Sequence, residues 1–204
     1  MKRRRTIYFN DARHWYLYVY EPPITVEQAW RPVDECVGTS VDTLTYGVER
    51  GDGNFYPSKV GMRFGEDMQP FQLAAYWRAW HNMQSLIDRG LDPLSVLIDR
   101  AHDKSMEFVA SVRMTAYLGM DHSHAVPKGR GYVHHKIRDH KLAILTELAH
   151  DYPTDGIEMD FSGSPGGGPL PLREKDVPEH ASTITDFVAS IADVVHNRPG
   201  SPGI

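Results

Sequence analysis

The segment from residue 155 to residue 161, DGIEMDF, alternates polar and apolar residues and predicts a short β-strand. Its three apolar side chains would share one face, and the opposite face would carry Glu158 and Asp160. An aperiodic loop rich in glycine and proline follows at residues 162–169. In a parallel α/β sheet this order places Asp160 at the carboxyl edge, where such folds keep their catalytic groups.

The rest of the chain alternates predicted strands with predicted helices. Runs rich in β-forming residues, one of them clearly alternating, predict three further strands, at residues 6–10, 41–48 and 106–114. Helical periodicity predicts five helices, at residues 26–37, 71–89, 92–104, 135–152 and 179–195. An aromatic and β-branched run predicts a short extended segment at residues 16–20. Strands separated by helices pair in parallel through right-handed crossovers, and no linker divides the chain, so we expect one domain over residues 1–204.

Polar residues on the predicted sheet favour a barrel over an open nucleotide-binding sheet. Asn10 ends the first predicted strand and Asp11 follows it, at the point where a nucleotide-binding fold would carry a glycine fingerprint. Ser111 and Arg113 would lie beside the two carboxylates of the last strand, as in the upper layer of a (β/α) barrel. A complete barrel needs eight strands and about 250 residues. We therefore expect an α/β fold of the TIM-barrel type, truncated to about four βα units, whose open sheet edges favour self-association.

Composition and charge exclude several classes of protein. Hydrophobic residues make up 41% of the chain and charged residues 24%, which is typical of globular and not of disordered proteins. The net charge of -5 argues against a nucleic-acid partner, whose phosphates need a basic surface. No apolar run approaches the roughly 20 residues that cross a bilayer, and no signal peptide is recognised, so we expect a cytoplasmic protein without a membrane partner. The single cysteine, Cys36, allows no internal disulfide and no cysteine-based zinc site.

Short motifs occur along the chain in an order that is typical of one group of proteins. They are YFND (8–11), YEPP (20–23), VDTL (41–44), RGDG (50–53), YPS (56–58) and DGIEMDF (155–161). Together they resemble the N-terminal part of glycoside-hydrolase-like TIM-barrel proteins of bacteria, and the resemblance covers nearly the whole chain, as far as Val195.

The resemblance implies a (β/α)8 barrel that acts on glycosidic bonds or descends from enzymes that do. In related retaining barrels an aspartate at the end of the fourth strand is the nucleophile, and that position corresponds to Asp160. The acid/base partner of those enzymes comes from a later strand, which this chain lacks. We therefore expect a glycoside hydrolase with a carbohydrate substrate that is inactive or weakly active as this truncated chain.

The residues themselves assign unequal roles to the two carboxylates. Glycoside hydrolysis needs two carboxyl groups that flank the bond, about 5 Å apart for retention or about 6.5–9.5 Å apart for inversion. Glu158 and Asp160 would be separated by about 7 Å on one strand, and two groups from one wall do not flank a sugar easily. Asp160 is therefore the candidate nucleophile or charge stabiliser, and Glu158 is expected to orient it or to pair with Arg113. The alternative is that both belong to a structural ion-pair network.

Candidate substrate-binding residues are polar or aromatic residues near the predicted carboxyl edge, because sugars are held by aromatic faces and planar hydrogen-bonding groups. They are Asn10, Asp11, Tyr46, Asp52, Tyr56, Arg113 and His122.

Two other functions stay open at this point. Asp121, His122, His124, His134 and His135 offer enough donors for a zinc ion, which would make a metal-dependent barrel hydrolase. Barrel metal sites draw their ligands from several strand ends, so solvated histidines are the favoured interpretation, and we predict neither a metal nor a cofactor. The third possibility is a non-catalytic remnant that binds carbohydrate or has a structural role.

Overall fold

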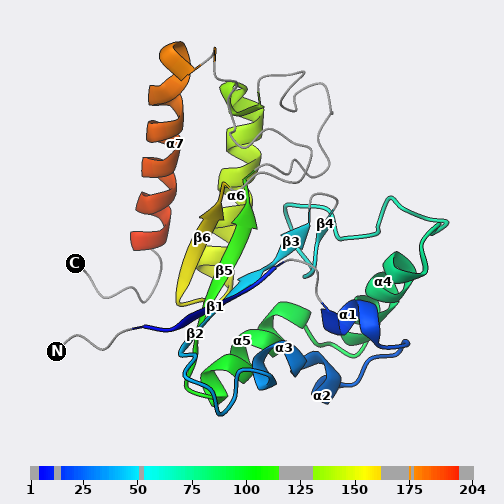
Figure 1. The fold of residues 1–204 in the computed structure, drawn as a ribbon. Coiled ribbons are helices and arrows are strands. Elements are labelled where there is room, and N and C mark those ends of the chain that lie inside the picture. The colour runs from blue at the N-terminus through cyan, green and yellow to red at the C-terminus, as the bar shows by residue number, and fades with distance from the viewer. Residues whose placement is uncertain are drawn as a thin grey trace.

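A parallel sheet of four strands organises the computed structural model, which describes residues 5–11, 15–50, 53–114, 131–161, 175 and 177–197. The strand order in the sheet is the order of the chain (Figure 1). The strands are β1 (Ile7–Asn10), β2 (Thr43–Gly47), β5 (Glu107–Arg113) and β6 (Gly156–Asp160). All three pairings are parallel, as the alternation of strands and helices predicts.

Helices connect the strands and pack against the sheet. They are α1 (Trp15–Val19), α2 (Val26–Ala29), α3 (Arg31–Asp34), α4 (Ala74–Ile87), α5 (Pro93–Asp103), the 3-10 helix η2 (Gly131–Val133), α6 (His135–Asp151) and α7 (Val177–His196). A two-stranded antiparallel hairpin, β3 (Glu49–Arg50) and β4 (Gly53–Asn54), follows β2. Figure 1 shows α6 behind β5 and β6, with α7 beside it.

The core lies between the helices and one face of the sheet. Leu44, Phe108, Ala110 and Val112 alternate along β2 and β5 and are fully buried. They share one side because every second residue of a strand points to the same face. The opposite face therefore carries the residues at odd-numbered positions of β5, from Glu107 to Arg113.

Two short segments differ from the sequence-based prediction. Residues 16–20 were expected to be extended, but Trp15–Val19 forms α1, and its Leu17 is fully buried in the core. The single helix expected over residues 26–37 is divided into α2 and α3. Pro32 has no N–H to continue the hydrogen-bond ladder of α2, and it occupies instead the first turn of α3, where proline is tolerated.

The sheet is open among the residues that the structure describes. Neighbours in the strand order are β1, β2, β5 and β6, and no strand pair joins β6 to β1. The architecture is consistent with part of a barrel of the TIM type, but the barrel is not closed. No described helix is both long enough and apolar enough to span a membrane.

Candidate active site

Strand register brings polar side chains together at the carboxyl edge of the sheet. Ser111 pairs with Glu158, and Arg113 pairs with Asp160, on the face opposite the core. The Ser111 hydroxyl donates a hydrogen bond to Glu158 Oε1 at 2.9 Å. One layer higher, Arg113 Nε lies 3.8 Å from Asp160 Oδ2. Glu158 is therefore the partner of Ser111, and Arg113 is the partner of Asp160.

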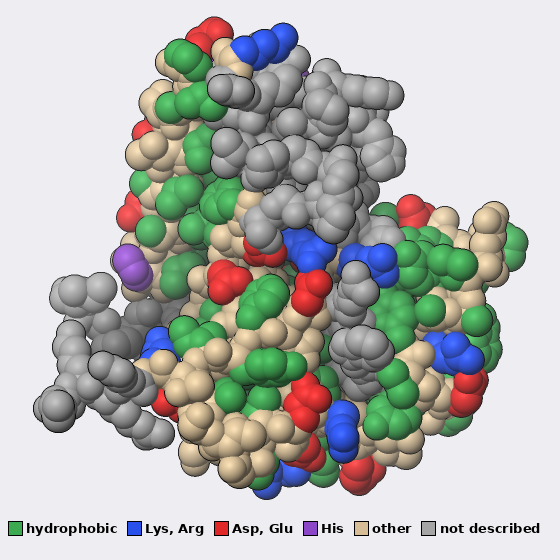
Figure 2. All heavy atoms as spheres, in the orientation of Figure 1, with side chains coloured by type: hydrophobic (Ala, Val, Ile, Leu, Met, Phe, Trp, Pro, Cys, Tyr) green, Lys and Arg blue, Asp and Glu red, His purple; other side chains and the backbone are tan. Residues whose placement is uncertain are grey.

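Arg113 connects the first and the last strand of the sheet. Its Nη2 donates to the carboxylate of Asp11, which directly follows β1, while its Nε faces Asp160 on β6. The Asp160 side chain is only 10% exposed, whereas that of Asp11 is 42% exposed. The guanidinium offsets the repulsion between the two carboxylates and holds both at one edge. Figure 2 shows acidic and basic side chains next to one another near the middle of this face.

A buried ion pair lies close to the backbone of Arg113. Lys141 Nζ, from α6, is 2.8 Å from Glu49 Oε1 and 3.0 Å from Glu49 Oε2, and both side chains are 0% exposed. Burial raises the pKa of the Glu49 carboxyl group, and the Lys141 charge and the backbone N–H of Arg113 oppose that rise. The sequence-based prediction missed both residues. The sequence does contain a signal for Lys141, because it lies between Ile137 and Ile144 on the apolar stripe of a predicted helix, where a charged residue is unusual.

Three predicted substrate-binding residues are not brought to this site. Tyr46 is buried on the helix-covered face, with its ring centroid 5.8 Å from that of Phe108. Asn10 is its register partner on β1 and is also buried. Tyr56 is fully buried, and its hydroxyl donates to Glu147 Oε2 at 3.2 Å. None of the three offers an open surface to a sugar, because alternation turns the first two toward the helices.

Some of the other predicted residues lie outside the described ranges. Asp52 and His122 are among the residues that the structure does not describe, as are Asp121 and His124 of the proposed metal set. Among the described residues, no group of three or more histidine, cysteine, aspartate or glutamate side chains is arranged to hold a metal ion.

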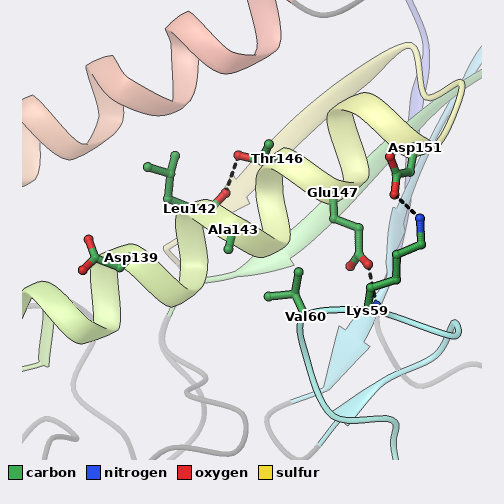
Figure 3. A pocket seen from close by; sticks show the side chains of 8 residues that line it. All are labelled: Lys59, Val60, Asp139, Leu142, Ala143, Thr146, Glu147 and Asp151. Atoms are coloured by element: carbon green, nitrogen blue, oxygen red, sulfur yellow. Dashed lines mark hydrogen bonds and ion pairs between the residues drawn. The ribbon is translucent and has the colours of Figure 1, made fainter.

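A shallow pocket lies on another surface of α6, beside the loop at residues 58–60 (Figure 3). Two of its three carboxylates, Glu147 and Asp151, already have partners: Glu147 accepts hydrogen bonds from Ser58 Oγ and from the backbone N–H of Lys59, each at 2.6 Å. Lys59 Nζ in turn lies 2.8 Å from Asp151. These interactions hold the loop against α6. The pocket is therefore a weaker candidate for a reactive site than the carboxyl edge of the sheet.

Comparisons with known proteins bear on the fold. No protein-family model and no curated protein matches the sequence. The solved structure of α-L-fucosidase isoenzyme 2 from Paenibacillus thiaminolyticus is similar over 99% of this chain, with a TM-score of 0.55 and 13% identity. The α-L-fucosidase AlfC from Lactobacillus casei is similar over 88% of it, with a TM-score of 0.44 and 14% identity.

This chain spans 32% of the Paenibacillus chain and 50% of the Lactobacillus chain. At such identities the likeness to the Paenibacillus structure concerns the fold alone. It supports a parallel α/β arrangement like that of part of a barrel of the TIM type.

Proposed function

We propose that this chain forms the nucleophile-bearing part of a glycoside hydrolase, with Asp160 as the nucleophile. The observation that carries the proposal is the position of Asp160 at the carboxyl end of β6, largely buried and 3.8 Å from Arg113. Catalytic residues of (β/α) barrels stand at that edge. The similarity in fold to an α-L-fucosidase supports the proposal and suggests α-L-fucosides as the first substrates to test.

The chemistry follows from the two carboxyl groups that glycoside hydrolysis requires. In a retaining reaction an Asp160 oxygen bonds to the anomeric carbon while the bond from that carbon to the leaving oxygen breaks. An acid protonates the leaving oxygen, and the resulting base then removes a proton from the water that releases the sugar. Arg113 orients the Asp160 carboxylate, and Glu158, bonded to Ser111, supports the layer beneath.

The acid/base group is not evident among the described residues. Glu158 lies on the same strand as Asp160, and Asp11 is engaged by Arg113. We infer that this group comes from outside the described residues. The same arrangement favours a second candidate, a carbohydrate-binding protein without catalysis, in which Arg113 and its two carboxylates contact sugar hydroxyls.

Asp160→Asn tests the proposal in the purified chain. L-Fucose binding, followed by NMR titration, should be seen in the wild type. Hydrolysis of an aryl α-L-fucoside should be slow in the wild type and at least about 10³-fold slower in the variant, because a nucleophile has been removed. Asp99→Asn, at an exposed position of α5, is the matched control and should leave binding and turnover unchanged.

The outcomes separate the two candidates. Binding without turnover in the wild type favours the carbohydrate-binding protein over the hydrolase. Turnover that survives Asp160→Asn excludes Asp160 as the nucleophile. A wild type that neither binds nor hydrolyses the fucoside, nor any other sugar in a panel of common aryl glycosides, contradicts both.

A further inference from the structure

The ion pair between Arg113 and Asp11 crosses the sheet. Arg113 ends β5, Asp11 directly follows β1, and β2 lies between these two strands. Neighbouring strands are about 4.8 Å apart, so roughly 10 Å of sheet separates the two backbones. Arg113 Nη2 nevertheless donates a hydrogen bond to Asp11 Oδ1. The arginine side chain therefore extends sideways over the end of β2 to reach its partner.

The residue of β2 beneath this crossing is a glycine. Gly47 is the last residue of β2 and pairs with Ser111, so it lies on the face of the sheet that also carries Arg113. Continuing the register of β1 and β2 by one residue places Asp11 beside Gly47. A larger residue in place of Gly47 would project into the space between Asp11 and Arg113. Gly47 is buried, which agrees with a guanidinium that lies over it.

The opposite edge of the sheet has a similar crossing with a different residue beneath it. There Arg5, which precedes β1, donates to Glu107 Oε1 of β5 at 2.6 Å. The residue of β2 at that level is Thr43, whose hydroxyl donates to Glu107 Oε2 at 2.9 Å. At the amino edge the middle strand takes part in the interaction through its side chain, whereas at the carboxyl edge Gly47 leaves the space to Arg113.

The guanidinium that Asp11 holds is also the partner of Asp160. Arg113 Nε lies 3.8 Å from Asp160 Oδ2 while Nη2 is bound by Asp11, so the planar group is engaged at two points. Two charged partners on different strands restrict a planar group to one orientation. Loss of the Asp11 charge would release one of these points, and the long arginine side chain would regain rotamer freedom.

We propose that Asp11 is a positioning residue and that Gly47 is the small residue on which it depends: Asp11 holds the Arg113 guanidinium across β2 and thereby sets it against Asp160. This role differs from the sugar contact that the sequence predicts for Asp11. The consequence for turnover rests on the proposed function, whereas the consequence for Arg113 does not.

Asp11→Asn in the full chain is the decisive variant. The Asp11 side chain is 42% exposed, and asparagine keeps its shape while removing its charge. The Arg113 Nε–H signal should shift or broaden in NMR spectra as the guanidinium loosens, and the signal of the Asp160 carboxyl carbon should shift with it. Asp11→Glu restores the charge and should return both signals most of the way to their wild-type positions.

Gly47→Val tests the path of the arginine side chain. Valine suits the strand backbone of β2, so this change fills the space over β2 and alters neither charge. It should reproduce the changes in both NMR signals that Asp11→Asn causes. Glu107→Gln is the matched control, because it removes a carboxylate that also binds an arginine across β2, at the opposite edge. It should leave the signals of Arg113 and Asp160 unchanged.

Kinetics separate positioning from sugar contact. If Asp11 acts through Arg113, Asp11→Asn should lower kcat for the aryl α-L-fucoside about tenfold and leave KM within about twofold of the wild-type value. A KM that rises about tenfold at an unchanged kcat would show that Asp11 touches the sugar, and it would overturn the positioning role.

Unchanged signals of Arg113 and Asp160 in Asp11→Asn also overturn the proposal, whether or not Gly47→Val folds. A folded Gly47→Val protein with wild-type signals overturns the part assigned to Gly47. Absence of turnover in the wild type counts against the proposed function alone, because the NMR signals still report on the guanidinium and on Asp160.

Discussion

Tyr56 and Tyr152 donate their hydroxyl protons to carboxylates inside the structure. Tyr56 bonds to Glu147 at 3.2 Å, and Tyr152 bonds to Asp92 at 2.7 Å. Burial, and then the nearby negative charge of Glu147, raise the pKa of Tyr56 well above its ordinary value. Burial and the bond to Asp92 likewise raise the pKa of Tyr152. Both phenols are therefore kept protonated by the fold.

These shifts predict a loss of stability in alkali. In the unfolded chain a tyrosine phenol has its ordinary pKa near 10, and in the folded chain these two phenols ionise at higher pH. The contribution of each tyrosine is therefore complete below about pH 10 and is lost as pH rises toward the folded-state value. Tyrosinate absorbance should show both groups ionising only as circular dichroism is lost. Tyr152→Phe should remove one tyrosine from that coupled step, and full ionisation of all ten tyrosines in the folded protein would contradict the prediction.

Local rules account for several positions that the sequence-based analysis identified. Asp160 and Arg113 are neighbours because alternation fixes their face and parallel pairing fixes their register. Tyr46 obeys the same alternation. Its aromatic character near a strand end suggested a binding role, but it lies on the face of the sheet that the helices cover and is therefore buried. Lys141 was harder to interpret, because its partner Glu49 lies far away in sequence.

The helix ends show which element boundaries the sequence encodes. Gly38 and Gly90 directly follow the predicted helices at residues 26–37 and 71–89, and they have φ angles of +81° and +76°, which residues other than glycine rarely adopt. The strands and the longer helices were predicted to within about three residues because their periodicity extends over many positions. α1 has only five residues and depends on contacts with α4 that are distant in sequence, so its sequence pattern alone was ambiguous.

The N-terminus of α5 offers a test at the scale of one element. Asp92 accepts hydrogen bonds from the backbone N–H groups of Leu94 at 2.8 Å and Ser95 at 3.4 Å. Its other oxygen accepts from Tyr152. Asp92→Ala removes all three bonds and should lower the free energy of unfolding by about 1–2 kcal/mol.

Urea denaturation measures that change. Asp99→Ala, at an exposed position of the same helix, also removes a carboxylate and should alter the free energy of unfolding by less than about 0.5 kcal/mol. Equal effects of the two substitutions would show that helix charge, and not the cap, sets the stability.

Over the whole molecule, the open sheet leaves apolar side chains at its first strand. Ile7 is 58% exposed and Phe9 is 45% exposed, and their register partners place them on the same face as Arg113. Within the described ranges, neither β1 nor β6 has a strand on its outer edge. An exposed edge with apolar side chains is a template for pairing with another chain.

We therefore predict that the purified chain self-associates reversibly through β1, which sedimentation velocity would detect as a rise in sedimentation coefficient with concentration. Ile7→Thr together with Phe9→Lys should weaken association, because a charge and a lost apolar surface both oppose edge pairing. Val37→Lys changes an exposed apolar residue that lies outside the sheet and should leave association unchanged. A sedimentation coefficient independent of concentration in the wild type, or equal effects of the two variants, would show that the β1 edge does not drive assembly.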